Sequence, residues 1–382
     1  MPRRTYFATC APGVEPILHE EGKALRLAKL ERQVGGIRFE GDRREAWRAN
    51  LLLRTAVRVL ERLERFNTPD GDALYHGVQA VDWRRYLHPE GSLVVTAQTK
   101  ESLLDHSLFV EQRTKDAIVD QLRTASGSRP TVSKDDPDLA VHVHLFRDRC
   151  TVSLDTSGSS LHKRGWRRFQ GRAPLSETLA AAVVLFSGWD QCSPLIDPFC
   201  GSATLLIEAA LLARGVPPGS FRKEFGFERF ADHDARAYRR LRDDLERRAQ
   251  PIGRAGKLIL RGIESDPETL AGARSNAEAA GVADAIDLQK GNARNVEFRR
   301  GWNGWIVTNP PYGERVGGND NLHSLYRDFG SRLREQCEGY QLALLSGNPS
   351  LEGDLGLAPQ RAIELQNGAL PCRLLTLEIP RA

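Results

Sequence analysis

The residues best suited to chemistry are Asn309, Pro310, Pro311 and Tyr312, which directly follow an apolar segment at residues 305–308. An exocyclic amine of a nucleic-acid base is a poor nucleophile, because its lone pair is delocalised. The side-chain oxygen of Asn309 and the carbonyl of Pro310 can accept hydrogen bonds from such an amine, and the prolines hold these acceptors rigidly. Tyr312 offers a ring on which a flipped base can stack. The alternative is a proline-rich turn with an asparagine cap, which the position after a strand disfavours.

A second motif joins the apolar segment 195–197 to a helix predicted over residues 203–214. Small residues at such a turn let a ligand approach the backbone at the carboxyl edge of a sheet. The helix N-terminus favours a negatively charged group. The motif lacks the G-x-G-x-x-G pattern of dinucleotide sites, and the carboxylate of a bound methionine moiety would fit it equally well. Its candidate cofactor-binding residues are Asp197, Phe199, Gly201, Ala203 and Thr204.

Three more candidates for cofactor binding follow the next two predicted strands. Glu264 ends the strand at residues 258–264, where a carboxylate can accept hydrogen bonds from ribose hydroxyls. Asp266 is the alternative, although an aspartate before Pro267 also suits the cap of a helix. Asn292 follows a third strand and can contact an adenine edge, or it can simply form a turn. Asn309 completes the set of cofactor-binding candidates.

Strands and helices alternate from Leu175 onwards, which predicts a parallel, doubly wound sheet with these motifs along one edge. The predicted strands cover residues 195–197, 258–264, 286–288, 305–308, 341–345 and 373–379. The predicted helices cover residues 177–187, 203–214, 268–280 and 322–337. Residues 215–257 form a longer insertion that ends in a basic, helical stretch at residues 236–248.

The first 155 residues mix both periodicities and predict an α+β module. Strands are expected at residues 5–10, 36–40 and 93–97, and helices at residues 14–30, 44–63 and 109–124. A hairpin is the clearest element, because apolar residues alternate over 139–145 and the chain returns over 151–154. His142 and His144 alternate with them, so a solvent-facing strand surface is favoured over a metal site, for which no third ligand is in view.

The segment between residues 155 and 174 lacks strong periodicity and predicts a basic linker. Basic residues interleaved with Trp166 and Phe169 can bind single-stranded nucleic acid by charge and stacking. A connecting segment with a packed tryptophan and solvated arginines is an equally good interpretation. The candidate RNA-binding residues are Lys163, Arg164, Arg167 and Arg168, with Arg172 nearby.

The composition is that of an ordinary globular protein, with 382 residues of which 40% are hydrophobic and 27% charged. No stretch approaches the roughly 18 apolar residues of a membrane span, and the first residues lack the apolar run of a signal peptide. A cytoplasmic protein without membrane contact is therefore expected. The six cysteines form no C-x-x-C pair, which argues against a zinc site, and no metal is expected. A net charge of +4 decides nothing about nucleic acids.

Taken together, these residues resemble the NPPY methyltransferases that use S-adenosylmethionine, and the whole chain is similar to their THUMP-domain branch. Within it, the chain most resembles the bacterial 23S rRNA guanine-N2 methyltransferases. The similarity rests on residues 7–9 with 13–15, 35–39, 115–120, 161–167, 197–210 and 309–315. The tetrad Asn309–Tyr312 alone also occurs in enzymes that methylate protein glutamine or DNA adenine, whereas the N-terminal half with residues 161–167 is more specific.

The resemblance implies a ferredoxin-like start and a THUMP module for structured RNA over residues 1–155, a linker over 156–175, and a Rossmann-like methyltransferase domain over 176–382. It implies Asp197, Gly201 and Glu264 around S-adenosylmethionine, with Asn309 and Tyr312 around a flipped guanine. Ala203 and Asn292 depart from the family pattern, which usually has glycine and aspartate there. The chain also ends before the second, 7-methylguanosine-forming domain of the family's fused form, so a single activity is expected.

Several alternatives remain open at the level of sequence. A transfer-RNA guanine is the nearest competing substrate for rRNA. Protein glutamine and DNA adenine are less favoured, because neither needs an RNA-binding half. A non-catalytic RNA-binding assembly factor and a NAD-linked oxidoreductase are also considered; the intact tetrad disfavours the first, and the glycine pattern after Asp197 disfavours the second. Oligomeric state and the modified nucleotide are not readable from the sequence.

Overall fold

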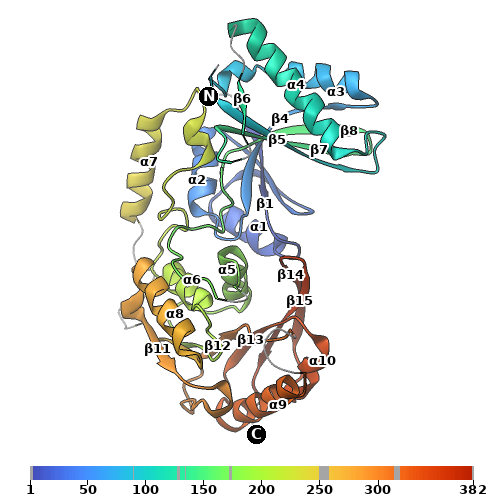
Figure 1. Ribbon diagram of the computed structural model, residues 1–382. Helices are drawn as coiled ribbons and strands as arrows, with labels where there is room; N and C mark the ends of the chain where they lie inside the picture. The colour runs from blue at the N-terminus through green and yellow to red at the C-terminus, as the bar shows by residue number, and fades with distance from the viewer. Residues whose placement is uncertain are drawn as a thin grey trace. The chain divides into compact units, whose positions relative to one another are not determined.

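The computed structural model describes residues 3–380 except Pro89, Lys134 and residues 127–129, 172–173, 249–257 and 314–318 (Figure 1). The chain forms two compact units. The first contains Met1–Cys10, His19–Leu161 and Arg222–Asp244, and the second contains Ala11–Leu18, His162–Phe221 and Leu245–Ala382. Most of the described insertion thus belongs to the first unit, although the sequence analysis placed it in the catalytic half.

The first unit is built on one eight-stranded sheet with the order β2-β3-β1-β4-β8-β7-β5-β6. Its strands are β1 (Arg4–Thr9), β2 (Ala28–Gln33), β3 (Gly36–Gly41), β4 (Arg58–Asn67), β5 (Ser92–Lys100), β6 (Thr131–Val132), β7 (Leu139–Phe146) and β8 (Arg149–Asp155). One face is apolar and buried, because Tyr6, Val59, Val141 and Val152 alternate with outward-facing polar residues.

Helices cover this apolar face. They are α2 (Arg43–Leu52), α3 (Gly71–Gln79) and α4 (Ser107–Ser126), together with a short 3₁₀ turn, η1 (Trp83–Arg85), that follows α3. From the insertion come η2 (Gly226–Arg229) and α7 (Ala235–Arg248). Aromatic rings connect the insertion to α2, since Phe227 and Tyr238 lie 5.9 and 5.6 Å from Trp47.

Two helices of this half end earlier than predicted. Helix α1 (Glu15–Ala24) stops before Arg26, whose φ of +56° is left-handed and closes the last turn. Helix α2 ends at Leu52, and the carboxylate of Glu21 accepts hydrogen bonds from the next free amides, those of Arg54 and Thr55. The predicted helices over 14–30 and 44–63 are therefore wrong beyond these points, where β2 and β4 take over.

The second unit carries a seven-stranded sheet with the order β11-β10-β9-β12-β13-β15-β14. Its strands are β9 (Leu195–Asp197), β10 (Leu260–Glu264), β11 (Ile286–Lys290), β12 (Trp305–Thr308), β13 (Gln341–Ser346), β14 (Arg361–Asn367) and β15 (Leu370–Glu378). The first five strands in this order are parallel, as predicted. The prediction of a wholly parallel sheet is wrong at the other end, because β14 and β15 form an antiparallel hairpin on β13.

Helices lie on both faces of this second sheet. They are α5 (Glu177–Phe186), α6 (Thr204–Ala213), α8 (Pro267–Ala279), α9 (Asn319–Gln336) and the short α10 (Pro349–Glu352). The remaining turns are η3 (Ala283–Ala285), η4 (Ala293–Asn295) and η5 (Gly353–Leu355). Ile196 shares a core with Phe329 of α9, whereas Gly262 on the other face lies against Leu206 of α6. No helix among the described residues is long and apolar enough to cross a membrane.

Candidate active site

The site lies beside β9, from which the chain adds β10 and β11 on one side of the sheet and then β12 and β13 on the other. Strand β9 is hydrogen-bonded to β10 on one side and to β12 on the other, so its carboxyl end marks the topological switch point where ligands of open α/β sheets bind. Asp197 ends β9, and Thr308 ends the neighbouring strand β12. The hydroxyl of Thr308 donates a hydrogen bond of 2.6 Å to the carboxylate of Asp197. The sheet thereby joins the two motifs that carry the chemistry.

Asp197 is an ionisable group held out of water, with 1% of its surface exposed. Burial raises the pKa of its carboxyl to about 7, and the nearby charge of Glu264 acts in the same direction. Hydrogen bonds from Thr308 and from the amide of Phe199, at 3.1 Å, oppose this shift. The same oxygen accepts both bonds, so one half of the carboxylate fixes the turn that follows β9.

The turn between β9 and α6 has a strained backbone. Gly201 and Ala203 both have left-handed backbones, with φ of +52° and +63°. This conformation costs a residue with a side chain about 1 kcal/mol, which gives a physical reason for glycine at position 203 in the family pattern. Ala203 is the N-cap of α6 and makes no side-chain capping bond. The N-terminus of this ten-residue helix is therefore open to an anionic group.

Two side chains from elsewhere in the second unit hold this turn in place. The guanidinium of Arg167 donates to Ser202 and Thr204 at 3.3 and 3.0 Å and pairs with Glu177 of α5 at 2.7 Å. The amide nitrogen of Asn276, on α8, donates to the carbonyl of Ser202 at 3.3 Å. Asn276 is fully buried, and its side-chain oxygen also accepts from the amides of Arg168 and Phe169.

The two acidic residues at the end of β10, Glu264 and Asp266, have different roles. One oxygen of Glu264 accepts the amide of Asp266 at 2.8 Å, and its carboxylate is partly exposed at the sheet edge. Asp266 accepts the amide of Thr269 at 2.8 Å and caps α8, as the sequence indicated. Asn292, exposed after β11, accepts the amide of Arg294 at 3.0 Å and starts the turn η4. Asn292 therefore forms a turn, which was one of the two roles considered for it from the sequence.

The tetrad after β12 presents an acceptor that has no partner in the described chain. The side-chain oxygen of Asn309 is buried and accepts no hydrogen bond from the described residues. Pro310 is buried beside it, and the carbonyl of Pro311 accepts a bond from Tyr326 at 3.3 Å. A buried acceptor without a donor costs about 1–3 kcal/mol, which is typical of a site that awaits a ligand.

Tyr312 is anchored at both ends of its side chain. Its hydroxyl accepts a hydrogen bond from the amide nitrogen of Asn367, in β14, at 3.0 Å, and burial raises the pKa of the phenol. Its ring lies against Gly347, where a Cβ atom would come within 2.3 Å of the ring. The ring is thus held in one orientation beside Asn309.

The basic segment before α5 corrects part of the sequence analysis. Arg164 is buried and pairs with the buried Glu208 of α6 at 3.3 Å, so the prediction that it contacts RNA is wrong. Most of the hydrogen-bond donors of Arg167 are bound to Glu177, Ser202 and Thr204 within the second unit. Trp166 is fully buried and cannot stack on a base. Lys163 and Arg168 are exposed, and their contact with RNA stays a prediction; Arg172 lies outside the described residues.

The two histidines of β7 that were weighed as a metal site lie in the first unit. His142 bonds to Thr96 at 2.7 Å and lies 3.5 Å from Asp155. Within the described part of the chain, no group of three or more histidine, cysteine, aspartate and glutamate side chains is placed to hold a metal ion.

Fold and site together define a Rossmann-like methyltransferase preceded by an α+β module. Residues 164–376, which are 213 of the 382 residues, match the family model of the RMKL-like methyltransferase domain, and the chain belongs to this family. Residues 5–60 match the RlmL ferredoxin-like domain, and residues 70–155 match the THUMP domain. This confirms the fold class and the family predicted from the sequence.

Individual relatives agree with this assignment. The chain is 42% identical over 377 residues to the ribosomal RNA large subunit methyltransferase K/L of Ectopseudomonas mendocina (strain ymp), covering 97% of this chain and 52% of that protein. The chain thus spans about half the length of the curated relatives it matches.

Two solved structures are similar over their full lengths. SMU.472, solved in complex with SAH, has a TM-score of 0.89 at 28% identity, covering 100% of both chains. A protein of Listeria monocytogenes str. 4b F2365, described as a predicted N6-adenine-specific DNA methylase, has a TM-score of 0.88 at 29% identity, covering 100% of this chain and 97% of that chain.

Several residues that build the site carry little signal in the sequence. Thr308, Asn276 and Asn367 were not singled out, and Arg167 was given another role. Their partners are 111, 74 and 55 residues away for the first three. No local pattern signals such contacts. The one available hint was that Thr308 directly precedes Asn309 at the end of a strand.

Proposed function

We propose that this protein transfers a methyl group from S-adenosylmethionine to the N2 amine of a guanine in the ribosomal RNA of the large subunit. The observation that carries the proposal is the buried side-chain oxygen of Asn309, an acceptor without a donor at the switch point of the sheet. The RNA substrate rests on the THUMP match and on the name of the K/L relatives. The choice of guanine N2 rests on the resemblance described above.

The chain's own residues fit the cofactor. The uncapped N-terminus of α6 suits the carboxylate of its methionine moiety. The partly exposed carboxylate of Glu264 suits the ribose hydroxyls, and Asn292 suits the adenine edge. Asp197 and Phe199 shape the turn between these groups. When bound, S-adenosylmethionine supplies an electrophilic methyl group, and the fit is supported by the SAH complex of SMU.472.

The target amine is activated by hydrogen bonding in this proposal. The side-chain oxygen of Asn309 and the carbonyl of Pro310 each accept a bond from the NH2 group, which localises the nitrogen lone pair towards the methyl donor. Tyr312 stacks on the flipped base, with its ring fixed by Asn367 and Gly347. No strong general base is required, because the proton can leave after the carbon–nitrogen bond forms.

The proposed division of labour follows the expected domains. Residues 1–155 bind RNA, residues 156–175 connect, and residues 176–382 carry out methyl transfer. The family matches at 5–60, 70–155 and 164–376 support this order. Arg222–Asp244 then serve the RNA-binding unit, with which they are packed.

The direct test is methyl transfer from labelled S-adenosylmethionine to unmodified 23S rRNA, transfer RNA and DNA in parallel, followed by nucleoside analysis. We expect N2-methylguanosine in 23S rRNA only. The same product in transfer RNA would move the substrate, and N6-methyladenine in DNA would favour the activity named for the Listeria neighbour. No transfer by a chain that binds S-adenosylmethionine and RNA would favour a non-catalytic assembly factor.

A further inference from the structure

The face of the first unit's sheet opposite the helix-covered core is hollowed. The hollow has a volume of about 1600 Å³, and seven of the eight strands, all except β6, contribute to its lining. Small-molecule sites in proteins occupy about 300–1,000 Å³ and are mostly apolar. This hollow is larger, and charged and polar side chains of adjacent strands share its lining with apolar ones, so a macromolecule is the appropriate occupant.

Strand register arranges these side chains in rows across the sheet. Residues that pair across neighbouring strands share a face. In the first row Arg62 lies opposite Thr5 on one side and Ser153 on the other, and Ser153 lies opposite His142. Two further rows run parallel to it: Arg65, Thr151, His144 and Gln98, and then Asn67, Arg149 and Phe146. These rows therefore present guanidinium, hydroxyl, amide and imidazole groups, with the phenyl ring of Phe146 at the end of the third row.

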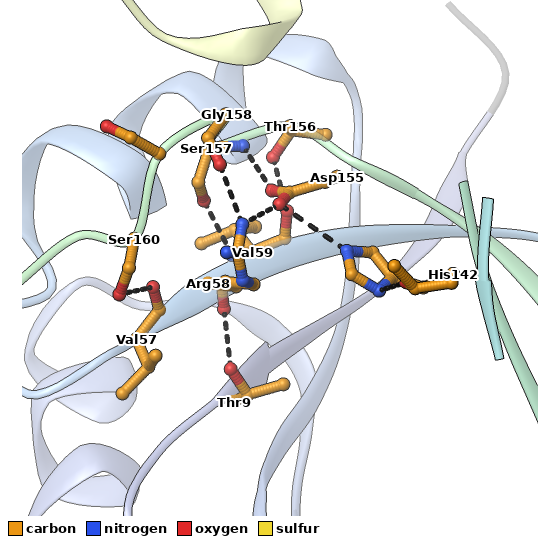
Figure 2. Close-up of polar contacts among 12 residues, drawn as sticks. Thr9, Val57, Arg58, Val59, His142, Asp155, Thr156, Ser157, Gly158 and Ser160 are labelled. Carbon is orange, nitrogen blue, oxygen red and sulfur yellow. Dashed lines mark hydrogen bonds and ion pairs between the residues drawn. The ribbon is translucent and has the colours of Figure 1, made fainter. Parts of the chain in front are cut away.

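The charge on this face is positive. Six arginines line the hollow, against two glutamates, Glu31 and Glu64. Three of the arginines are paired with acids. Figure 2 shows Arg58 and His142 converging on the buried Asp155. Arg38 pairs with Glu31 and Glu40, and Arg147 with Glu101.

The other three arginines make no ion pair with any described residue: Arg62, Arg65 and Arg149. Arg65 and Arg149 are exposed and stand in adjacent rows. Arg62 is partly buried, which lowers the pKa of its guanidinium, and Arg38 and Arg65 add to this effect. Three guanidinium groups that form no ion pair with a described residue, on one concave surface, are complementary to phosphates.

The aromatic side chains of this face decide which form of nucleic acid fits. Recognition of single strands depends on open aromatic faces for base stacking. The guanidinium of Arg62 lies over the Phe7 ring at 4.5 Å and that of Arg147 over the Phe146 ring at 5.0 Å, so a cation occupies one face of each ring, although Phe146 stays 39% exposed. Double-stranded RNA is instead recognised through phosphates and 2′-hydroxyls. Arginines between threonine, serine and asparagine side chains match those groups.

We propose that this hollow face binds the backbone of double-stranded RNA, with Arg62, Arg65 and Arg149 on the phosphates and the neighbouring hydroxyl and amide side chains on the 2′-hydroxyls. The proposal rests on the RNA substrate proposed above and adds where and in which form the RNA is held. It takes the place of Arg164 among the candidate RNA contacts, because Arg164 is buried.

The test compares two charge-matched variants of the full chain. Arg65→Glu with Arg149→Glu reverses two charges inside the hollow. Arg44→Glu with Arg85→Glu reverses two exposed charges in α2 and η1, outside its lining. Binding to a fluorescent RNA duplex of about 20 base pairs, and to one of its strands alone, is followed by anisotropy over a salt series. Circular dichroism confirms that both variants are folded.

We expect the hollow variant to bind the duplex at least about tenfold more weakly and to lose about two units of salt slope, because each phosphate contact contributes about 0.9. The control should stay within about twofold of the wild type. Equal affinities of the two variants would overturn the surface while leaving the RNA substrate intact. Tight binding of the single strand but not of the duplex would overturn the proposed form. A wild-type chain that binds neither RNA would refute the RNA substrate itself.

Discussion

Replacing Asn309 with alanine should lower turnover without lowering the free energy of unfolding, and the structure indicates the size of both effects. The side-chain oxygen is buried and accepts no hydrogen bond from the described residues. Removing it therefore breaks no bond in that part of the fold and relieves the cost of an unsatisfied acceptor, about 1–3 kcal/mol. We expect the free energy of unfolding of Asn309→Ala to equal or exceed that of the wild type, a rare result for a partly buried polar residue.

The effect on turnover should be large. A preorganised hydrogen-bonding group that acts on developing charge contributes about 2.7–4 kcal/mol to the transition state, so its loss lowers the rate by about 10²–10³. Single-turnover methyl transfer, with RNA and S-adenosylmethionine saturating, measures this step. Calorimetric titration measures cofactor affinity, which should change by less than about threefold, because the deleted oxygen acts on the target amine.

Asn292→Ala is the matched control, since it makes the same chemical change at the exposed end of β11. It should weaken cofactor binding while leaving the saturated rate nearly intact. Should Asn309→Ala lose cofactor affinity and turnover in equal measure, or unfold more readily than the wild type, the role assigned to its side-chain oxygen would be wrong.

Three further predictions concern the frame of the site. Because burial raises the pKa of Asp197 to about 7, the folded chain holds that proton more tightly than the unfolded chain, so this group's contribution is full below about pH 4 and is lost as pH rises to 7. The stability of Asp197→Asn relative to the wild type should thus increase between about pH 4 and 7 in urea titrations, by at most about 1.4 kcal/mol per pH unit; parallel curves would contradict this. Arg164→Ala should cost about 3–5 kcal/mol because it leaves Glu208 buried and charged, whereas Arg164→Met with Glu208→Leu should recover most of the loss in thermal unfolding. Ala203→Gly should release left-handed strain of about 1 kcal/mol, partly offset in the unfolded chain; a lower melting temperature would refute this account.

The sequence predicts the catalytic half well because its signals are local. Buried strands such as 195–197 and 305–308 are short apolar runs bounded by turn residues, and both match the structure residue for residue. The carboxyl ends of parallel strands share an edge, so Asp197, Glu264 and Asn309 could be brought together before any coordinates. The antiparallel hairpin β14–β15 was missed because residues 361–367 lack a clear apolar alternation, although Asn367-Gly368 is the kind of dipeptide that turns a hairpin and lies where the two strands join.

The N-terminal half shows the limit of periodicity. The stretch over residues 44–63 fits a helix with apolar residues three and four apart, yet Arg58–Asn67 form a central strand between β1 and β8. Tertiary pairing overrides local preference there, because eight strands bury one continuous apolar face. The same pairing sets Arg65 beside Thr151, although 86 residues separate them. A surface made by cross-strand rows is therefore invisible in the linear sequence.

Arginine is the residue type for which sequence and structure diverge most. Arg164 and Arg167, in the most basic stretch of the chain, are consumed by Glu208 and Glu177 within the methyltransferase fold. Arg65 and Arg149 stand in strands whose local sequence balances them with acids, yet they make no ion pair with any described residue. An arginine is available to a phosphate when no acidic side chain lies next to it in the folded structure. The number of charges along the sequence does not show which arginines meet this condition. The paired variants of the hollow face test this distinction directly, because both change the net charge by the same amount and differ only in where the charge lies.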